Sequence, residues 1–199
     1  MDDPDNISRQ ENEQKLIKLC QQGDSIAFER LYRRFSRDVY NMALKMVLSE
    51  EIADEVTQEV FVSIYKNIQK FQFQSAFSTW IYRIVYRRSA DYFRKARKHE
   101  HNRVDLGYNS LNQNLDFIPD PNPTPLERTV EEEQQVLIEQ AIESLAPKQR
   151  IIIILRYIQD CSYEEIAQIL NCRIGTVKSR LNRAHKLLEE KLRTKKYIR

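Results

Sequence analysis

Two groups of basic residues recur at helical spacing in this chain, each beside side chains that suit nucleic acid. In the first group, Arg83, Arg87 and Arg94 fall on one face of a helix, with Tyr82 and Tyr86 along its flank. Arginines follow phosphates, and tyrosine rings stack on unpaired bases. The combination is typical of a surface that binds single-stranded nucleic acid.

The second group lies on the second of two helices that a short turn joins. Ser162 and Glu165 form the S-x-x-E capping box that begins the first helix, and Val177 and Leu181 mark the buried side of the second. The opposite side is basic and polar, as in a DNA-binding helix-turn-helix, whose second helix enters the major groove. A plain pair of surface helices with solvated charges is the alternative. The side chains on this exposed face are Lys178, Ser179, Asn182, Arg183 and Lys186.

No pattern typical of catalysis accompanies these two groups. His99, His101 and His185 lie among charged residues and have no acidic or cysteine partner at metal-ligand spacing. The sequence also lacks a glycine-rich phosphate loop, a nucleophile elbow and a paired-carboxylate motif. We therefore expect no catalytic residue, no metal site, no cofactor and no enzyme activity.

The composition favours helix over sheet. The 199 residues include only 3 Gly and 6 Pro, and Leu, Ile, Glu, Lys, Arg and Gln are abundant. The longest apolar run, 151–155, is far below the roughly 18 residues that span a bilayer, and the acidic N-terminus does not resemble a signal peptide. We therefore expect a cytoplasmic all-α protein that does not insert into membranes. The 3 cysteines, an odd number without C-x-x-C spacing, are expected to be free structural thiols.

The net charge of +3 conceals alternating blocks of charge. Residues 81–100 carry 7 basic and 2 acidic groups, and residues 171–199 carry 10 and 2. Residues 101–170 between them carry 5 basic and 12 acidic groups. Two basic blocks separated by an acidic one indicate two separate contacts with a polyanion.

Periodicity and turn residues divide the chain into two helical domains joined by a flexible, acidic, proline-rich linker. Four prolines within 119–125 exclude helix or central strand there. An aromatic and polar loop at 70–78 precedes a helix from Thr79 to about Lys98, on whose apolar face Arg88 is expected to lay its stem along the core edge. The predicted units are a first domain at 8–100, the linker at 101–129 and a helix-turn-helix domain at 130–195.

The helix that follows Ser49 has an acidic exposed side beside apolar residues. Such a face can serve solubility, or it can dock a basic and partly apolar partner, and the sequence alone leaves both open. The residues of this face are Asp54, Glu55, Gln58, Glu59, Phe61 and Val62.

Taken together, the motifs resemble those of bacterial RNA polymerase sigma factors of the extracytoplasmic-function (ECF) class. Residues 54–61 resemble the family's segment that docks on the polymerase clamp helices, and 77–84 with Asp91 and Arg94 resemble its promoter-melting helix. Residues 145–150, 165–167 and 175–184 resemble its second DNA-binding domain. The resemblance covers nearly everything from Ala27 to Leu192.

The resemblance implies core RNA polymerase, promoter DNA and an anti-sigma factor as partners, the last often membrane-anchored. It implies that the first domain binds the −10 element and captures single-stranded DNA, with the 71–79 loop holding a flipped-out base. The implied −10 residues are Phe71, Gln74, Ser75, Phe77, Thr79, Tyr82, Arg83, Tyr86, Arg87, Asp91 and Arg94. The implied residues for the duplex −35 element are Ser162, Arg173, Thr176, Lys178, Ser179, Arg180, Asn182, Arg183 and Lys186. The acidic face at 54–62 is the implied polymerase-binding surface.

The chain departs from the family pattern at a few positions, and two other functions compete with this interpretation. The family usually has Asn at the position of Arg87, so the sequence preference at the −10 element stays open. A response-regulator-like transcription factor shares the Glu-Ile-Ala and Thr-Val-Lys patterns, but it requires a receiver domain of alternating strands and helices. A pure interaction protein that uses the acidic face leaves both basic groups unexplained.

Overall fold

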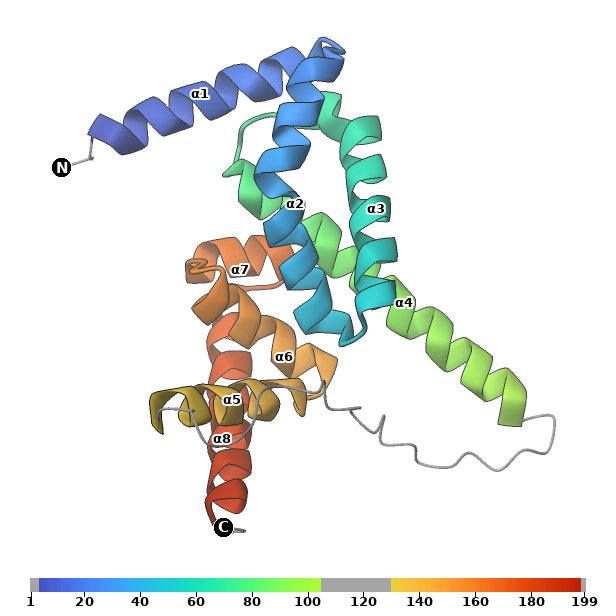
Figure 1. Cartoon of the computed structure of the whole chain (residues 1–199), viewed down its shortest axis with the longest axis vertical. Helices are drawn as coiled ribbons and strands as arrows, with labels where there is room; N and C mark the ends of the chain where they lie inside the picture. The colour runs from blue at the N-terminus through green and yellow to red at the C-terminus, as the bar shows by residue number, and fades with distance from the viewer. Residues whose placement is uncertain (1–3, 105–129, 198–199) are drawn as a thin grey trace.

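The computed structural model describes residues 4–104 and 130–197, with side chains for 12–95 and 134–193. These residues form helices without any β-strand, which confirms the all-α prediction. The α-helices run in two groups, one above the other in Figure 1. They are α1 (Pro4–Gln21), α2 (Ser25–Val47), α3 (Glu50–Asn67), α4 (Phe77–Val104), α5 (Val130–Glu143), α6 (Pro147–Ile153), α7 (Tyr163–Leu170) and α8 (Ile174–Tyr197).

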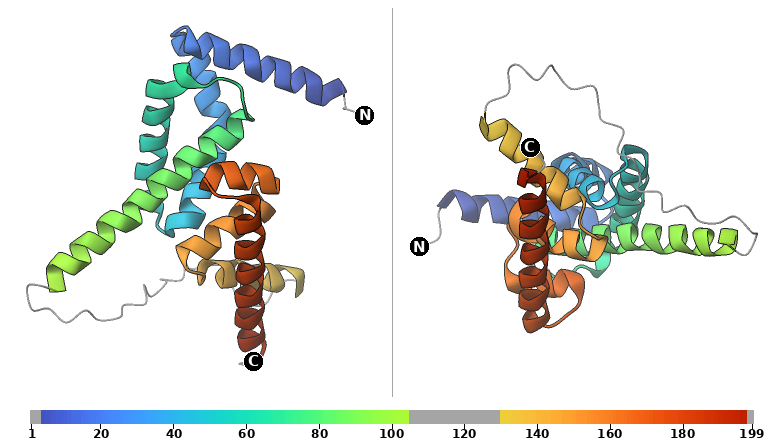
Figure 2. Two further views of the ribbon diagram at one scale, coloured as in Figure 1. Left: turned by 180° about the vertical axis from the view of Figure 1, so that it is seen from behind. Right: turned by 90° about the horizontal axis from the view of Figure 1, so that it is seen from below.

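In the first group, α2, α3 and α4 pack around one core and α1 rests on the end of α2. The Asp24 side chain begins α2 by accepting hydrogen bonds from the backbone N–H of Ile26 (2.8 Å) and Ala27 (3.0 Å). The helix ends at Leu48, whose left-handed backbone (φ 57°) turns the chain into α3. Seen from behind, α4 crosses α2 and α3 diagonally and continues beyond them (Figure 2).

Two predicted helix boundaries are wrong. The helix expected from Thr79 begins at Phe77, because Phe77 and Trp80 already pack as the first apolar turn of α4. Its C-terminal end lies at Val104, so the first residues of the expected linker are helical. The remainder of that linker, 105–129, lies outside the described residues, and the predicted domain division stays a prediction.

The second group, α5–α8, is built around the run Ile151–Leu155. Pro147 occupies the first turn of α6, where its missing N–H costs nothing. All five residues of the run are buried, which confirms that it is a buried helix. The helix passes into a π-helical segment, η2 (Ile154–Ile158), before the chain turns into α7.

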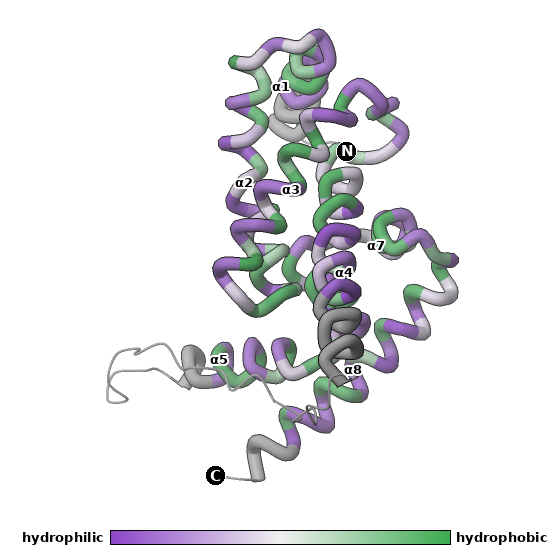
Figure 3. Tube along the Cα trace, turned by 90° about the vertical axis from the view of Figure 1, so that its right-hand side faces the viewer, coloured by the Kyte–Doolittle hydropathy of each residue, from purple (hydrophilic) through white to green (hydrophobic). Residues whose placement is uncertain are grey.

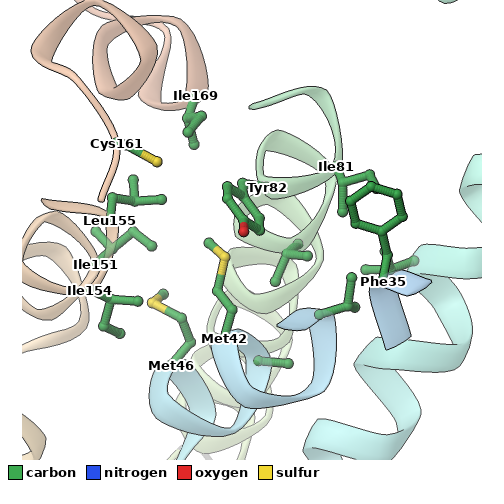
Figure 4. Close-up of a cluster of buried hydrophobic side chains, with 14 of the residues drawn as sticks. Phe35, Met42, Met46, Ile81, Tyr82, Ile151, Ile154, Leu155, Cys161 and Ile169 are labelled. Carbon is green, nitrogen blue, oxygen red and sulfur yellow. The ribbon is translucent and has the colours of Figure 1, made fainter. Parts of the chain in front are cut away.

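The two groups share one buried core. Tyr82 on α4 lies beside Met42 of α2, and Leu155 and Cys161 from the second group line the same cluster (Figure 4). The side view in Figure 3 places α7 beside α4, and these two helices are in contact. The predicted halves therefore pack against each other directly in the described residues.

The buried guanidinium of Arg150, on α6, forms several hydrogen bonds across this junction. Its Nη1 donates to the carbonyl oxygen of Met46 at 2.9 Å, and its Nη2 donates to those of Glu143 (2.6 Å) and Leu145 (2.9 Å). The carbonyls at the C-terminal end of a helix have no partner within the helix. The Arg150 side chain therefore donates to carbonyls at the end of α2 in the first group and to carbonyls near the end of α5 in the second group.

Candidate nucleic-acid and polymerase interfaces

The turn between α7 and α8 is fixed by local hydrogen bonds. Ser162 Oγ accepts from the Glu165 N–H (3.1 Å), and the Glu165 carboxylate accepts from the Ser162 N–H (2.8 Å), which confirms the capping box. Asn171 then adopts a left-handed backbone (φ 49°), and the Cys172 N–H donates to the Ala167 carbonyl (3.0 Å). The turn therefore holds α8 at a set angle to α7.

The basic face of α8 is exposed between Lys178 and Lys186. Val177, Leu181 and Ala184 are buried against the rest of the second group. The opposite side carries no buried residue, as expected for a helix that enters a major groove. The exposed side chains are Arg173, Lys178, Ser179, Arg180, Asn182, Arg183 and Lys186.

Two residues predicted for the −35 surface have hydroxyls that make local hydrogen bonds. Ser162 is half-buried and its hydroxyl caps α7, so its main role is to begin that helix. Ser179 is exposed, and its hydroxyl donates to the backbone carbonyl of the half-buried Thr176 (3.0 Å).

An aromatic cluster forms the loop before α4. The Phe71 ring centroid lies 4.9 Å from that of Phe73, 5.1 Å from Phe77 and 5.5 Å from Trp80. Phe71 and Phe77 are buried, so the prediction that they contact DNA directly is corrected: their rings support the loop from within, because they fill the core beneath it. Gln74 is exposed and Ser75 half-buried, as a contact with DNA requires.

The first turns of α4 are covered by α7. The Thr79 hydroxyl, with the residue 1% exposed, donates to Glu165 Oε1 at 3.1 Å, and Arg83 Nε donates to the Gln168 carbonyl at 3.0 Å. Tyr82 is 8% exposed, and burial raises the pKa of its hydroxyl well above the ordinary value, with smaller contributions from Asp38, Cys161 and Glu165. The predicted exposure of Thr79 and Tyr82 is therefore wrong for this arrangement, because a helix about 85 residues further along the chain packs on them.

The middle of α4 stays accessible. Arg87 and Arg94 are exposed and Tyr86 is half-buried. Asp91 accepts a hydrogen bond from Arg94 Nη2 at 2.7 Å, which holds that guanidinium over the helix surface. Arg88 lies over the core edge as expected and pairs with Glu59 at 3.7 Å.

The acidic face of α3 is largely as predicted, with one exception. Asp54, Glu55, Gln58 and Val62 are exposed, whereas Phe61 is 5% exposed and packs against the Tyr32 ring at 4.6 Å. Phe61 is therefore a core residue and not part of the docking surface.

Tyr65, which the sequence reasoning missed, completes the exposed stripe of α3. Asp54, Gln58, Val62 and Tyr65 follow one another at spacings of four, four and three residues, so they share one helical face. That spacing is visible in the sequence and identifies Tyr65 as the aromatic member of the face. The ring contacts Phe28 edge-on at 5.1 Å.

Other kinds of site are absent from the described part of the chain. No group of three or more His, Cys, Asp or Glu side chains could hold a metal ion there. The three cysteines are free thiols, and burial raises the pKa of Cys20 to about 11 and that of Cys161 to about 12. Among these residues, none of the helices is long and apolar enough to cross a bilayer.

The chain is similar to known sigma factors over both groups of helices. Residues 31–99 match the family model for Sigma-70 region 2, and residues 135–188 match that for Sigma-70, region 4. Two solved structures have the same fold. CnrH in complex with the cytosolic domain of CnrY has a TM-score of 0.63 at 20% identity, covering 90% of this chain and 96% of the other. The sigma factor RpoE in complex with the anti-sigma factor NepR, from Bartonella quintana, has a TM-score of 0.61 at 22% identity, covering 83% and 96%.

Curated relatives match over almost their whole length. The ECF RNA polymerase sigma-E factor of Haemophilus influenzae is 31% identical, over 94% of this chain and 98% of the relative. The ECF RNA polymerase sigma factor SigW of Bacillus subtilis is 32% identical over 90% and 96%, and the sigma-E factor of Escherichia coli is 33% identical over 94% and 97%. With this identity across both matched regions, the chain belongs to the ECF sigma factors of RNA polymerase.

Proposed function

We propose that this ECF sigma factor divides promoter recognition between α8 and a surface formed by the 71–76 loop and the middle of α4, with α3 as its polymerase-binding surface. The observation that carries the proposal is the exposed basic face of α8 between Lys178 and Lys186, opposite the buried Val177, Leu181 and Ala184. Arg183 and Asn182 lie near the middle of that face, suited to base edges in the major groove of the −35 element. Arg173, at the turn before α8, suits a phosphate contact.

The −10 surface comprises the exposed tip of the 71–76 loop and the accessible middle of α4. Gln74 and Ser75 offer hydrogen-bonding groups beside the aromatic cluster, and Arg87 and Arg94 offer cations along the helix. A flipped-out base costs a few kcal/mol to unstack, which stacking and hydrogen bonding offset. This arrangement suits the single strand that appears as the duplex opens.

The exposed stripe of α3 is the proposed surface for core polymerase. Asp54, Glu55 and Gln58 present acidic and polar groups, followed by Val62 and Tyr65. Such a face complements a basic helix with apolar residues on the same side. It lies on the outside of the first group, away from α7 (Figure 1).

The contact of α7 with α4 covers part of the −10 surface, and that part cannot bind DNA while the contact lasts. Thr79 cannot bind DNA while it is buried and its hydroxyl donates to Glu165, and Arg83 has its Nε engaged by the Gln168 carbonyl, which restricts its position. We infer that α7 leaves α4 when the protein engages polymerase and promoter. The described arrangement is then the form of the protein apart from DNA.

An anti-sigma factor is the proposed regulator. RpoE from Bartonella quintana was solved in complex with the anti-sigma factor NepR, and CnrH was solved with the cytosolic domain of CnrY. Both share the fold of this chain, which supports a partner of the same kind here. The sigma factor itself acts in the cytoplasm, where polymerase is, and a membrane-anchored partner would hold it at the membrane.

Run-off transcription from a library of randomised promoters tests the proposal. Core RNA polymerase is assayed with and without the protein, and initiation that depends on the protein is expected from templates sharing a two-part motif. Binding of the isolated protein to duplex DNA without any dependent initiation would instead support a conventional transcription factor.

A further inference from the structure

The C-terminal end of α1 holds the loop that precedes α4. The side-chain amide of Gln21 donates both of its hydrogen bonds to backbone carbonyls there, to Ile68 at 3.0 Å and to Phe71 at 2.8 Å. These carbonyls lie about 50 residues away in sequence. The residues that match the Sigma-70 region 2 family begin at 31, so α1 lies outside that match.

Phe73 stands at the tip of this loop in an unusual conformation. Its backbone is left-handed (φ 57°), which a bulky side chain rarely adopts. The residue is 36% exposed, and one side of its ring rests on Phe71, whose centroid is 4.9 Å away. A strained position that keeps an aromatic ring at the surface marks a candidate functional residue.

A cation from α1 accompanies this ring. Lys18 Nζ lies 6.0 Å from the Phe73 ring centroid, and the lysine is itself exposed. Lys18 is one turn before Gln21 on the same helix. The end of α1 therefore supplies both the donor that positions the loop and a positive charge beside its exposed ring.

We propose that Lys18 and Phe73 bind one unpaired nucleotide of the opened promoter strand, and that Gln21 is a positioning residue for this contact. The ring stacks on the base, and the ammonium group neutralises the adjoining phosphate. The proposal rests on the proposed −10 surface and extends it to α1 and to the loop tip.

Single-stranded nucleic acid fits this surface better than a peptide does. The next residue, Gln74, is exposed, and the chain leads into α4, on which Arg87 and Arg94 are exposed, so cations lie both on α1 beside the ring and further along α4. Single-stranded nucleic acid carries phosphates and exposed base faces, and these match a protein surface that offers both cations and aromatic rings.

The test uses holoenzyme reconstituted with core polymerase, on a promoter selected from the randomised library. Two templates are compared, a full duplex and one with a mismatched bubble across the −10 element, and the lifetime of the heparin-resistant complex is measured. Phe73→Gly removes the ring and relieves the backbone, so the loop stays folded. We expect complex lifetimes on the bubble template to fall about tenfold for Phe73→Gly, as for loss of one base stack, and to be retained in Phe73→Tyr.

Matched variants at the end of α1 distinguish a local contact from a general effect of charge or of folding. Lys18→Ala is expected to shorten the lifetime severalfold, whereas Lys15→Ala, an exposed lysine one turn earlier, is expected to leave it unchanged. Gln21→Met removes the two donors and is expected to shorten the lifetime, whereas the change at its exposed neighbour, Gln22→Met, is not. Association with core polymerase is measured for every variant and is expected to stay normal.

The possible failures are distinguishable. If no library template supports dependent initiation, the proposed function fails. If a promoter is found but Phe73→Gly and Lys18→Ala match the wild type on the bubble template, the α1 contact is overturned and the proposed function stands. Equal loss in Lys15→Ala and Lys18→Ala, or weakened core association in Phe73→Gly, would also overturn it, since the effect would then come from general charge or from a polymerase contact.

Discussion

Replacing Arg150 by methionine is expected to loosen the junction between the two groups of helices. The guanidinium donates three hydrogen bonds shorter than 3 Å, to Met46, Glu143 and Leu145, and the residue is only 6% exposed. Burial lowers the pKa of this group, while the Glu143 carboxylate raises it, and an arginine remains charged throughout the working range. Methionine fills a similar volume without a donor, so the change isolates the hydrogen bonds from the packing.

The magnitude follows from the number of acceptors that lose their donor. A hydrogen bond contributes about 1 kcal/mol net, more when one partner is charged, and a carbonyl left without a partner adds its own cost. Three such bonds give a loss of about 3–5 kcal/mol in the free energy of unfolding, part of which is offset because the variant no longer buries a charge. Lys148→Met, an exposed change on the same helix, is expected to alter stability by less than about 0.5 kcal/mol.

Urea denaturation followed by two probes measures the effect. Trp80 is the one tryptophan of the chain and stacks on Phe77, so its fluorescence reports the first group, whereas far-ultraviolet circular dichroism reports helices in both. In the wild type the two transitions are expected to coincide, because the groups share a core. In Arg150→Met they are expected to separate, with the overall midpoint lowered. A loss below about 1 kcal/mol with coincident transitions would refute the reasoning.

Three further predictions concern the DNA surface, the polymerase surface and pH. Arg183→Ala is expected to weaken promoter binding by about 1–3 kcal/mol if the contact is to a base, measured by holoenzyme binding to the −35 element, with the ion-paired Arg193→Ala as control. Asp54→Lys combined with Gln58→Ala is expected to abolish co-purification with core polymerase while circular dichroism stays unchanged; normal co-purification would exclude this face. Burial, with smaller contributions from nearby carboxylates, raises the pKa of the Cys161 thiol from 9.0 to about 12. Above pH 9 the Cys161 thiol therefore keeps its proton in the folded state but loses it in the unfolded chain. The contribution of this thiol to stability is constant below pH 9 and is lost as the pH rises toward 12. Urea midpoints at pH 8 and pH 10.5 are expected to show a smaller decline in Cys161→Ala than in the wild type.

The features that the sequence predicts well are those set by neighbouring residues. The capping box of Ser162 and Glu165 and the helical spacing of Val177 and Leu181 each depend on residues within one or two turns. For that reason the helix-turn-helix and its exposed basic face could be derived from the chain alone.

The features that the sequence predicts poorly depend on helices distant in the chain. Phe61 was assigned to an exposed face, yet α3 packs against both α2 and α4, which widens its buried arc beyond one stripe. Thr79 and Tyr82 are buried because α7 packs on them, and nothing near either residue indicates that contact. The sequence around Gln21 does not indicate its hydrogen bond to the loop, because the carbonyl that accepts it lies about 50 residues further along the chain.

The residues that join the two groups of helices include some that we propose bind the promoter, and this overlap couples the two proposed surfaces. Arg83 Nε donates to the Gln168 carbonyl, which holds this proposed DNA contact against α7, and Thr79 is accessible only when Glu165 withdraws. The apparent affinity for the −10 strand is therefore reduced by the fraction of molecules that are closed, whatever the intrinsic affinity of the open surface. A partner that separates α7 from α4 raises promoter binding without touching the DNA surface, and a partner that stabilises their contact lowers it. Because Glu165 also caps α7, the carboxylate that masks Thr79 belongs to the helix-turn-helix itself, so the placement of one proposed promoter-binding element governs access to the other.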